Sequence, residues 1–386
     1  MSEADFLALV AALEEGGADL ATPLAGERVA VLGAGPDGQL AAACALAGGK
    51  EVGLFTVYNA QRAALVQAGA ITVRGEGPIG SYAIDATGRA SIRLAAGVDE
   101  AVAPADVVIL TGSSSEQRLY GEMAAPLLNA GQTIVLAPGR TFGALEAWWW
   151  LRAARNRSSV TVAEISGSAS DVDSPAIGRI EVTVQRPVRV GAIPSNRALP
   201  VADLLGGWWG AVTPAPTVIH SSFHDGSGLV EVPSLMLGGP AAADELESPP
   251  AGITTVHADL WGGLLSAGVN AIISALANER RSVAAQWGVR DLPSDPEWPD
   301  RPGDRRRPSA TEAKDIVRES VVASLVPLAS AAHKVGVDVP LTDSLVTLAS
   351  AVSGLDLATA GRTLDAIGWT GADIDAIRRA VGVRWS

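Results

Sequence analysis

Residues 28–39 decide the fold of this chain: Arg28-Val29-Ala30-Val31-Leu32-Gly33-Ala34-Gly35-Pro36-Asp37-Gly38-Gln39. The apolar run predicts a strand that ends at Gly33, and the Ala-rich segment after it predicts a helix. Three glycines stand between them at G-x-G-x-x-G spacing. Gly33 permits a tight turn, Gly35 lets a pyrophosphate approach the backbone, and Gly38 lets the helix pack close to the strand. The residues expected to surround a dinucleotide are Gly33, Ala34, Gly35, Pro36, Asp37 and Gly38.

Composition limits the class of protein. The 386 residues are enough for two domains, and 48% hydrophobic with 18% charged residues is typical of a compact protein. A net charge of −13 argues against a nucleic-acid or anionic-membrane surface. The single Cys44 excludes an internal disulfide and a multi-cysteine metal site, and no metal cluster is expected. The absence of a long uncharged span, and the acidic start with Glu3 and Asp5, predict a cytoplasmic protein.

Strands and helices alternate in the first half of the chain, which predicts an α/β fold with a doubly wound parallel sheet of Rossmann type. The ligand crevice of such a sheet lies beyond the carboxyl ends of its strands. The expected strands are 28–33, 51–55, 70–74, 106–111, 133–137, 160–165, 178–184 and 188–193. The expected helices are 38–48, 60–67, 115–130 and 141–155.

The pattern changes after Pro194 and Pro200, where strand-like runs give way to helical ones and predict an all-α C-terminal domain. The expected domains are an N-terminal helical extension at 1–26, with its helix at 4–15, a dinucleotide-binding domain at 27–198, and a helical substrate and dimerisation domain at 199–386. The expected helices of that last domain are 201–210, 258–287, 311–335, 340–353, 356–366 and 370–381. Two stretches rich in Pro, Gly, Ser or charge, 211–256 and 291–309, read as long loops. The Trp148-Trp149-Trp150 run is expected to pack between domains or in a dimer.

Several of these landmarks resemble the octopine/nopaline (opine) dehydrogenase family, whose members reductively join an amino acid to a keto acid with NAD(P)H. Beside the glycine loop stand a strand–turn–helix segment at 133–146 that contains Pro138-Gly139-Arg140-Thr141, a short strand that ends in Glu164, and Ala192-Ile193-Pro194. In the helical half, Leu325-Val326-Pro327 and Gly361-Arg362-Thr363-Leu364 are also similar to family motifs. The resemblance covers about 27–370 and implies the fold, the nicotinamide cofactor and a small-molecule substrate.

The resemblance implies further cofactor contacts at the rim of the crevice. The turn of Pro138, Gly139, Arg140 and Thr141 offers backbone N–H groups and a hydroxyl to the nicotinamide end. Ser113 follows another strand and reads equally as a helix cap or a cofactor contact. The end of the second strand carries Thr56 instead of an acid for a ribose 2′-OH, and Arg62 is near enough in sequence to meet a 2′-phosphate, so the cofactor is NADP or NAD with a lean to NADP.

The family's chemical residues align with different side chains here. Its catalytic His aligns with Val232, the Asp that orients it with Ser320, and its carboxylate-binding Arg with Asp315. Lys314 and Arg318, one helical turn apart, are alternatives for the missing positive charge, unless they form only a solvated face.

Candidates for a proton donor are three titratable residues in the expected loop at 217–231: His224 beside Asp225, His220, and Glu231 as a general acid if buried. His257 and His333 read as capping or surface residues. The leading hypothesis is an NAD(P)H-dependent oxidoreductase that reduces an imine or ketone of a specialised small molecule, such as an intermediate of secondary metabolism. The alternatives are an inactive nucleotide-binding scaffold or sensor, and an ordinary opine dehydrogenase. A homodimer is expected.

Overall fold

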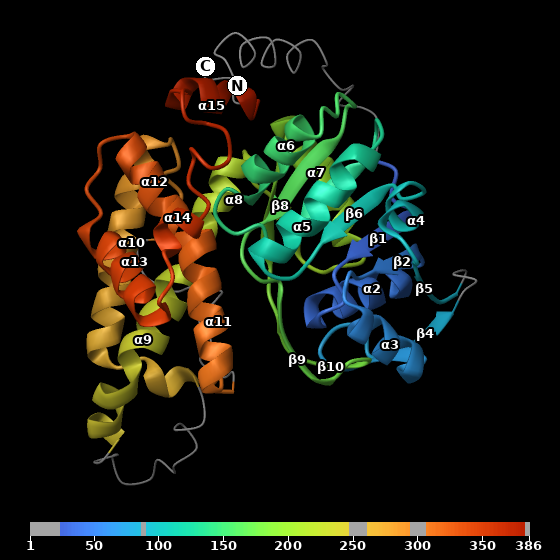
Figure 1. Cartoon of the computed structure of the whole chain (residues 1–386), viewed down its shortest axis with the longest axis horizontal. Helices are drawn as coiled ribbons and strands as arrows, with labels where there is room; N and C mark the ends of the chain where they lie inside the picture. Colours follow the sequence, from blue (N-terminus) through green and yellow to red (C-terminus); the bar gives the residue numbers. More distant parts are fainter. Residues whose placement is uncertain (1–23, 86–89, 247–260, 294–305, 383–386) are drawn as a thin grey trace. The chain divides into compact units, whose positions relative to one another are not determined.

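The structure is a computed structural model that describes residues 24–85, 90–246, 261–293 and 306–382 (Figure 1). The chain forms two compact units, one of residues up to Ser222 together with those from Gly371 on, the other from Phe223 to Thr370. The expected helix at 4–15 and His257 lie outside the described residues.

The first unit is built on a largely parallel sheet, as the alternating pattern predicts. β1 (Arg28–Leu32) pairs in parallel with β2 (Glu51–Phe55) on one side and β6 (Val107–Leu110) on the other. β7 (Thr133–Leu136) and β8 (Thr161–Ile165) continue the parallel order beyond β6. The helices of this unit are α2 (Pro36–Ala47), α3 (Asn59–Ala68), α4 (Val98–Val102), α5 (Ser114–Ala124), η1 (Ala125–Leu127), α6 (Gly143–Ala153), η2 (Ser195–Arg197), α7 (Ala198–Gly206), α8 (Val218–His224, which ends just past the unit boundary) and α15 (Ile374–Ala380).

The sheet is mixed toward both edges. Its described strands run in the order β12-β11-β8-β7-β6-β1-β2-β5-β4-β3-β10-β9. β11 is antiparallel to β8, β4 to β3, and β9 to β10. The sequence did not predict β4, β5, β9 or β12. The remaining strands are β3 (Ala70–Gly75), β4 (Gly80–Asp85), β5 (Ile92–Leu94), β9 (Ser170–Ala176), β10 (Arg179–Gln185), β11 (Val188–Ile193) and β12 (Val212–Pro214).

The core of the first unit lies between β1 and α2. β1, β6 and β7 are buried along almost their whole length, which fits strands covered on both faces. α2 is nearly all alanine in its middle, so it packs close to the sheet, and Cys44 on this helix is buried. Burial raises the pKa of the Cys44 thiol to about 12, because the thiolate would lose its hydration.

Asp106 fixes the start of β1 against the start of β6. Its carboxylate accepts hydrogen bonds from the backbone N–H groups of Glu27 and Arg28 at 3.1 and 3.0 Å, and from the Arg28 guanidinium at 2.6 Å. Burial opposes ionisation of this carboxyl, but the hydrogen bonds outweigh it and hold the pKa of Asp106 below its usual value.

Trp148 and Trp150 are buried and Trp149 is partly exposed. Packing of this run between domains or in a dimer stays a prediction. Trp150 fills the space above Gly121 of α5, where an added Cβ would lie 2.1 Å from its ring. The guanidinium of Arg152 lies 4.7 Å from the centroid of the Trp148 ring.

The second unit is helical in its described residues. The expectation of a loop at 211–256 was wrong for most of 212–246, which forms β12, α8 and α9, while 247–256 lies outside the described residues. Gly238 of α9 shows why composition misled: an added Cβ there would lie 2.5 Å from the carbonyl oxygen of Leu264, so this glycine serves close packing. The elements are α9 (Ser227–Leu246), η4 (Trp261–Leu264), α10 (Ala267–Gln286), α11 (Ala310–Ser320), the π-helical turn η5 (Val321–Leu325), α12 (Val326–Lys334), α13 (Pro340–Ser353) and α14 (Leu357–Ala360).

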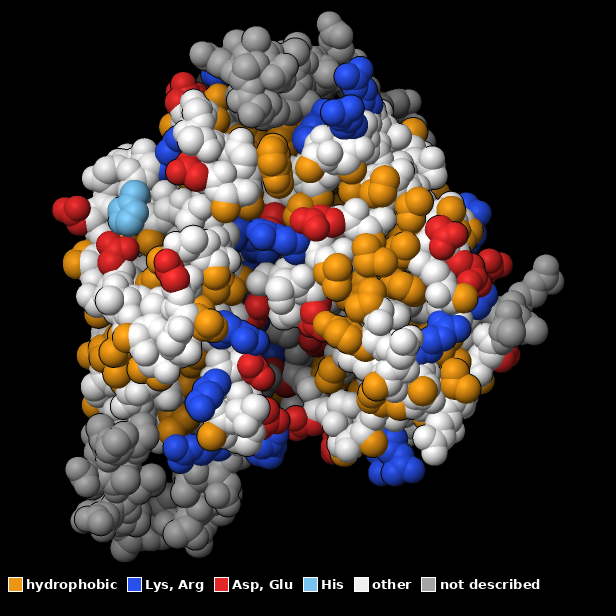
Figure 2. Space-filling model, in the orientation of Figure 1, with side chains coloured by type: hydrophobic (Ala, Val, Ile, Leu, Met, Phe, Trp, Pro, Cys, Tyr) orange, Lys and Arg blue, Asp and Glu red, His pale blue; other side chains and the backbone are white. Residues whose placement is uncertain are grey.

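The change between units comes at 222–223, later than the domain boundary expected at 198. The reason is that α7 packs on the sheet: Ala198, Val201, Ala202 and Leu205 all belong to the same buried cluster as β11. On the face in Figure 2, acidic and basic side chains of the described residues are interspersed. In the described part of the chain, every helix is too short or too polar to cross a bilayer.

Candidate functional site: the glycine loop and two polar clusters

The glycines of the loop after β1 have distinct geometry. Gly33 has φ +115°, a conformation that other residues rarely adopt, and an added Cβ would lie 2.5 Å from the Thr111 hydroxyl. At Gly38 an added Cβ would lie 1.9 Å from the carbonyl oxygen of Gly33, so α2 can approach β1 only without a side chain there. These two glycines are required by the protein's own packing.

Gly35 differs from both. It precedes α2 with φ −67°, which any residue can adopt, and an added Cβ would meet nothing within 4 Å. Neither the backbone conformation nor the packing of neighbouring atoms therefore requires a glycine at position 35. A side chain would instead occupy the space in front of the first turn of α2, which has no side-chain cap. That space suits an anion, because the first N–H groups of a helix have no intrahelical partners and the helix dipole is positive at this end.

Gln39 holds this loop from behind. Its side-chain amide donates to the carbonyl of Ala34 at 3.0 Å and accepts from the N–H of Gly178 at 2.8 Å. The side chain is buried, so it fixes the loop and leaves the outer side of Gly35 open.

The Pro138–Thr141 turn has an unusual backbone. Arg140 has φ +59° and Phe142 has φ +65°, and they are two of three non-glycine residues with positive φ in the described chain. Such conformations cost about 1–3 kcal/mol each and persist where the surroundings enforce them, often at functional sites. The Ala137–Pro138 peptide is cis. Thr141 is buried and Arg140 is partly exposed.

Glu164 enforces the shape of this turn. Its buried carboxylate accepts a hydrogen bond from the N–H of Ala144 in the first turn of α6, and from the hydroxyls of Ser221 and Ser222 on α8, at 2.7, 2.8 and 2.6 Å. An added Cβ at Gly139 would lie 2.4 Å from the Glu164 Cβ, so only glycine fits there. Glu164, the last residue but one of β8, is therefore a structural anchor for the turn.

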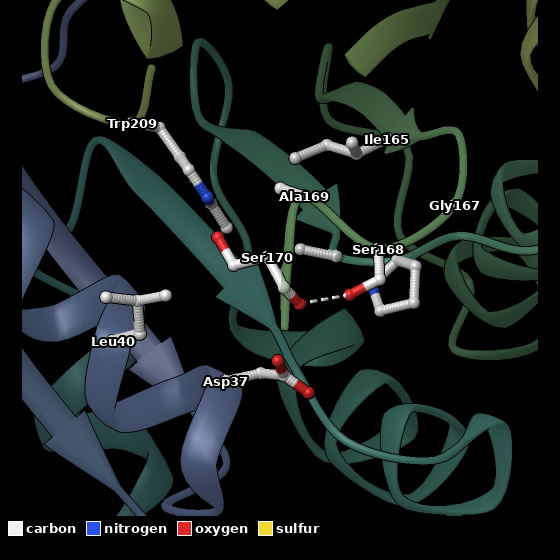
Figure 3. Close-up of a pocket in the computed structure, with 10 residues that line it drawn as sticks. Asp37, Leu40, Ile165, Gly167, Ser168, Ala169, Ser170 and Trp209 are labelled. Carbon is white, nitrogen blue, oxygen red and sulfur yellow. Dashed lines mark hydrogen bonds between the residues drawn. The ribbon is translucent and has the colours of Figure 1, made fainter. Parts of the chain in front are cut away.

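The loops expected to bind a cofactor meet at one edge of the sheet. The Gln117 amide of α5 donates to the carbonyls of both Gly112 and Pro138, at 3.2 and 2.8 Å. Asp37 and Pro138 line one pocket, which Figure 3 shows between the start of α2 and the segment 165–170. Trp209 forms another wall of this pocket, and the Ser168 hydroxyl donates to the Ser170 carbonyl at 2.8 Å. Nothing in the sequence pattern pointed to Gln117 or Trp209.

Ser113 caps α5. Its hydroxyl accepts from the N–H of Glu116 at 3.3 Å, and the Glu116 carboxylate accepts from the N–H of Ser113 at 2.9 Å. This reciprocal capping box accounts for a serine at 113 without a ligand. A cofactor contact by Ser113 stays a prediction.

Thr56 and Arg62 lie farther along the same edge. The Thr56 hydroxyl donates to Gln61 at 2.8 Å and accepts from the N–H of Tyr58 at 3.1 Å, and the Tyr120 hydroxyl lies 3.4 Å away. Arg62 on α3 is partly exposed and donates to the carbonyl of Ala95. Arg62 is thus held beside β5 by one of its nitrogens.

The three candidate proton donors stand on helices, not on the loop expected at 217–231. His220 lies on α8 in the first unit, with Nδ1 3.0 Å from the Thr217 hydroxyl. His224 ends α8 in the second unit, and its Nε2 lies 3.7 Å from the Asp291 carboxylate. The structure pairs each histidine with a different neighbour and does not place the two in one unit.

Glu231 occupies a more defined setting on α9. The buried Ser320 hydroxyl, at the end of α11, donates to its carboxylate. Glu231 is half-buried, and the next residue, Val232, is fully buried. The Glu231–Ser320 hydrogen bond therefore joins α9 to α11.

A second polar cluster adjoins this pair. The buried Asp225 carboxylate accepts from the N–H and hydroxyl of Ser227 at 3.2 and 2.6 Å, and from the Ser324 hydroxyl. Ser320 and Ser324 flank or belong to the π-helical turn η5, a rare structure that is often found at functional sites. Gly228 lets the backbones approach, since an added Cβ would lie 2.8 Å from the Ser324 Cβ.

The described residues contain no group of three or more His, Cys, Asp or Glu placed to hold a metal ion. Asp315 lies on α11 and pairs with Arg318 at 3.2 Å.

Comparison with known proteins finds a similar sequence and several similar folds. No family model matches the sequence. An opine dehydrogenase from Arthrobacter sp. (strain 1C) is 26% identical over 371 residues, which span 91% of this chain and 98% of that protein.

Solved structures show the same fold. An octopine dehydrogenase in complex with NADH and agmatine matches with a TM-score of 0.68 and 16% identity, over 93% of this chain and 99% of that one. A yersinopine dehydrogenase with bound NADP+ matches with a TM-score of 0.63 and 16% identity, over 92% and 97%. The chain is thus similar to an opine dehydrogenase along nearly the whole of both sequences, and it shares the fold of these solved structures.

Proposed function

We propose that this protein is an NAD(P)H-dependent oxidoreductase that reduces an imine or a ketone of a specialised small molecule. The observation that carries the proposal is Gly35, which the protein's own packing does not require and whose missing side chain leaves the first turn of α2 open. A diphosphate fits that position because it meets helix N–H groups and the positive end of the helix dipole. The sequence match to an opine dehydrogenase supports the same conclusion.

The residues that would hold the cofactor are the loop from Gly33 to Gly38 and the turn from Pro138 to Thr141. When bound, NAD(P)H supplies a hydride. The chain has to hold the diphosphate, orient the acceptor, exclude water and provide a proton. Glu164 and Gln117 would contribute by keeping the turn rigid.

We favour NADP over NAD on the charge of Arg62, because the end of β2 has Thr56 where an acid would bind a ribose 2′-OH. A guanidinium suits a phosphate better than a hydroxyl. Both cofactors occur among the structural relatives, so this choice rests on Arg62 alone.

For the proton donor we favour Glu231 over His224 and His220. Glu231 is half-buried, its carboxylate is oriented by Ser320, and it lies on a helix next to a π-helical turn. A carboxylic acid held in one orientation can give a proton to a developing amine or alcohol. Ser320 would then act as a positioning residue for Glu231.

The proposal is tested by following NADPH and NADH oxidation with a panel of keto acids, each with and without amino acids. We expect oxidation that depends on the organic substrate, and a loss of roughly 10²–10⁴-fold in kcat for Glu231→Gln. Ser320→Ala should shift the pH profile with a smaller loss, while the exposed Asp338→Asn serves as a matched control. Cofactor binding with no turnover on any pair would favour the inactive scaffold, and full activity of Glu231→Gln would exclude Glu231.

A further inference from the structure

The end of α6 carries a group of three arginines that the proposed reaction does not use. Arg152 lies in the last turn of this helix, and Arg155 and Arg157 follow it within five residues. Arg155 and Arg157 are exposed, and Arg152 is partly exposed. In a chain with a net charge of −13, a short stretch with three positive charges and no negative one is unusual.

These arginines have no acidic partner among the described residues. The Arg152 guanidinium lies 4.7 Å from the centroid of the Trp148 ring, and its buried Nε makes no hydrogen bond. Burial, and after it the charge of Arg157, lowers the pKa of Arg152. By contrast, Arg28 at the start of β1 pairs with Asp106 at 2.6 Å. Like charges held close together without a counter-charge favour the binding of an anion.

The start of the described chain lies at the same edge of the sheet as these arginines. β1, β6, β7 and β8 are parallel neighbours, and Val29 of β1 stands in one row with Thr161 of β8. Three strand spacings of about 4.8 Å separate these two residues, or roughly 14 Å. Arg157 comes four residues before Thr161. The point where residues 1–23 join the chain is therefore close to the arginine group.

The charge of residues 1–23 is complementary to that of the arginine group. The segment contains neither Lys nor Arg, and its acidic residues are Glu3, Asp5, Glu14, Glu15 and Asp19. The chain as a whole has 29 basic residues for 42 acidic ones, so the segment is much more acidic than the rest. Even at the helical rise of 1.5 Å per residue, a stretch of this length covers a gap of about 14 Å.

We infer that residues 1–23 bind the arginine group at the end of α6 through their carboxylates. Because the segment is tethered close to the group, it has a high effective concentration there and outcompetes a free anion or a separate acidic protein. The surface lies at the edge where the strands start, opposite to the edge that we propose for the cofactor. The inference is therefore independent of the redox reaction.

The test measures a distance in the full chain. Ala12→Cys and Ser159→Cys introduce one cysteine in the segment and one exposed cysteine beside the arginine group, and both carry spin labels. The native Cys44 is buried and stays unlabelled. Double electron–electron resonance then reports the distance between the labels. We expect one narrow distance for the docked segment.

Charge reversal should release the segment. Each exposed ion pair contributes a factor of roughly 1.4 to 5 to an equilibrium, so Arg155→Glu/Arg157→Glu should raise the ratio of undocked to docked chains about twofold to 25-fold. The matched control is Arg74→Glu/Arg179→Glu, which reverses two exposed arginines on β3 and β10 and should leave the distance unchanged.

A charge swap identifies the partners. Glu14→Arg/Glu15→Arg should release the segment, and its combination with Arg155→Glu/Arg157→Glu should restore the narrow distance. Arg155→Gln/Arg157→Gln repeats the test without adding like charges, and every variant is checked by thermal unfolding.

A broad distance distribution in the labelled protein with all its arginines would overturn the inference. So would a narrow distribution that both arginine variants leave unchanged, because the segment would then be held elsewhere. A narrow distance that arises only on mixing two singly labelled proteins would also overturn it, since the segment would then bind a second copy of the chain.

Discussion

Two glycines of one loop should respond to substitution in opposite ways. At Gly38 an added Cβ would lie 1.9 Å from the Gly33 carbonyl oxygen, a backbone atom that cannot rotate away. Gly38→Ala must therefore push α2 from β1, and overpacking of this kind costs about 1–3 kcal/mol. For a unit of this size we expect the melting temperature to fall by roughly 2–4 °C per kcal/mol.

Gly35→Val should behave differently, because its side chain meets no protein atom within 4 Å and its φ of −67° suits any residue. Loss of a favourable N-cap residue costs stability of at most about 1 kcal/mol. The valine would occupy the space that we assign to the diphosphate, and losing one hydrogen bond to a charged group costs about 1.5–3 kcal/mol, or roughly 10- to 150-fold in Kd.

Both variants are measured by thermal unfolding and by fluorescence titration with NADPH and NADH. We expect Gly35→Val to keep its melting temperature within a few degrees and to lose cofactor affinity, while Gly38→Ala loses stability. The reasoning is refuted if Gly35→Val binds the cofactor like the wild type, or if it is destabilised as much as Gly38→Ala.

Three further predictions concern single side chains. Asp106→Asn should lower the free energy of unfolding by about 2 kcal/mol at neutral pH, since charge-assisted hydrogen bonds to β1 are lost. Because the folded-state pKa of Asp106 is lowered, its ionised carboxylate stabilises the fold at pH values above its unfolded pKa near 3.8. This stabilisation is lost as the pH falls through the folded-state pKa. Urea unfolding at a series of acidic pH values should therefore show that the free energy of unfolding falls less steeply with falling pH in Asp106→Asn than in the wild type. The thiol of Cys44 should not react with a thiol reagent at mildly alkaline pH until the protein unfolds, because its pKa is raised to about 12. Fast reaction in the folded protein would instead show that α2 opens and exposes the thiol. Arg62→Ala should weaken NADPH binding about tenfold and leave NADH binding unchanged, and an equal effect on both cofactors would remove the preference for NADP.

Much of the first unit could be predicted from sequence because local and tertiary signals agree there. β1, β2 and β7 are short apolar runs bounded by turn residues, and the glycine spacing fixes how β1 leads into α2. β9 could not be found this way, since its sequence contains Asp171, Asp173 and Pro175. Among the strands that the structure describes it forms the edge of the sheet beside β10, a position where a proline is tolerated.

The second unit was harder, because its helices use glycine for close packing. Gly228 and Gly238 read as loop residues, yet each lets α9 approach a neighbouring backbone or side chain. Only the three-dimensional contacts reveal that need. The same holds for the site: Glu231 could be named from sequence, whereas its hydrogen bond to Ser320, 89 residues later in the chain, could not.

The central claim is that the turn between β1 and α2 holds a nicotinamide dinucleotide. Calorimetric titration of the unmodified protein with NADPH and with NADH tests it most directly. We expect saturable binding of at least one of them with a micromolar Kd and one site per chain. If neither produces measurable binding, the claim is contradicted.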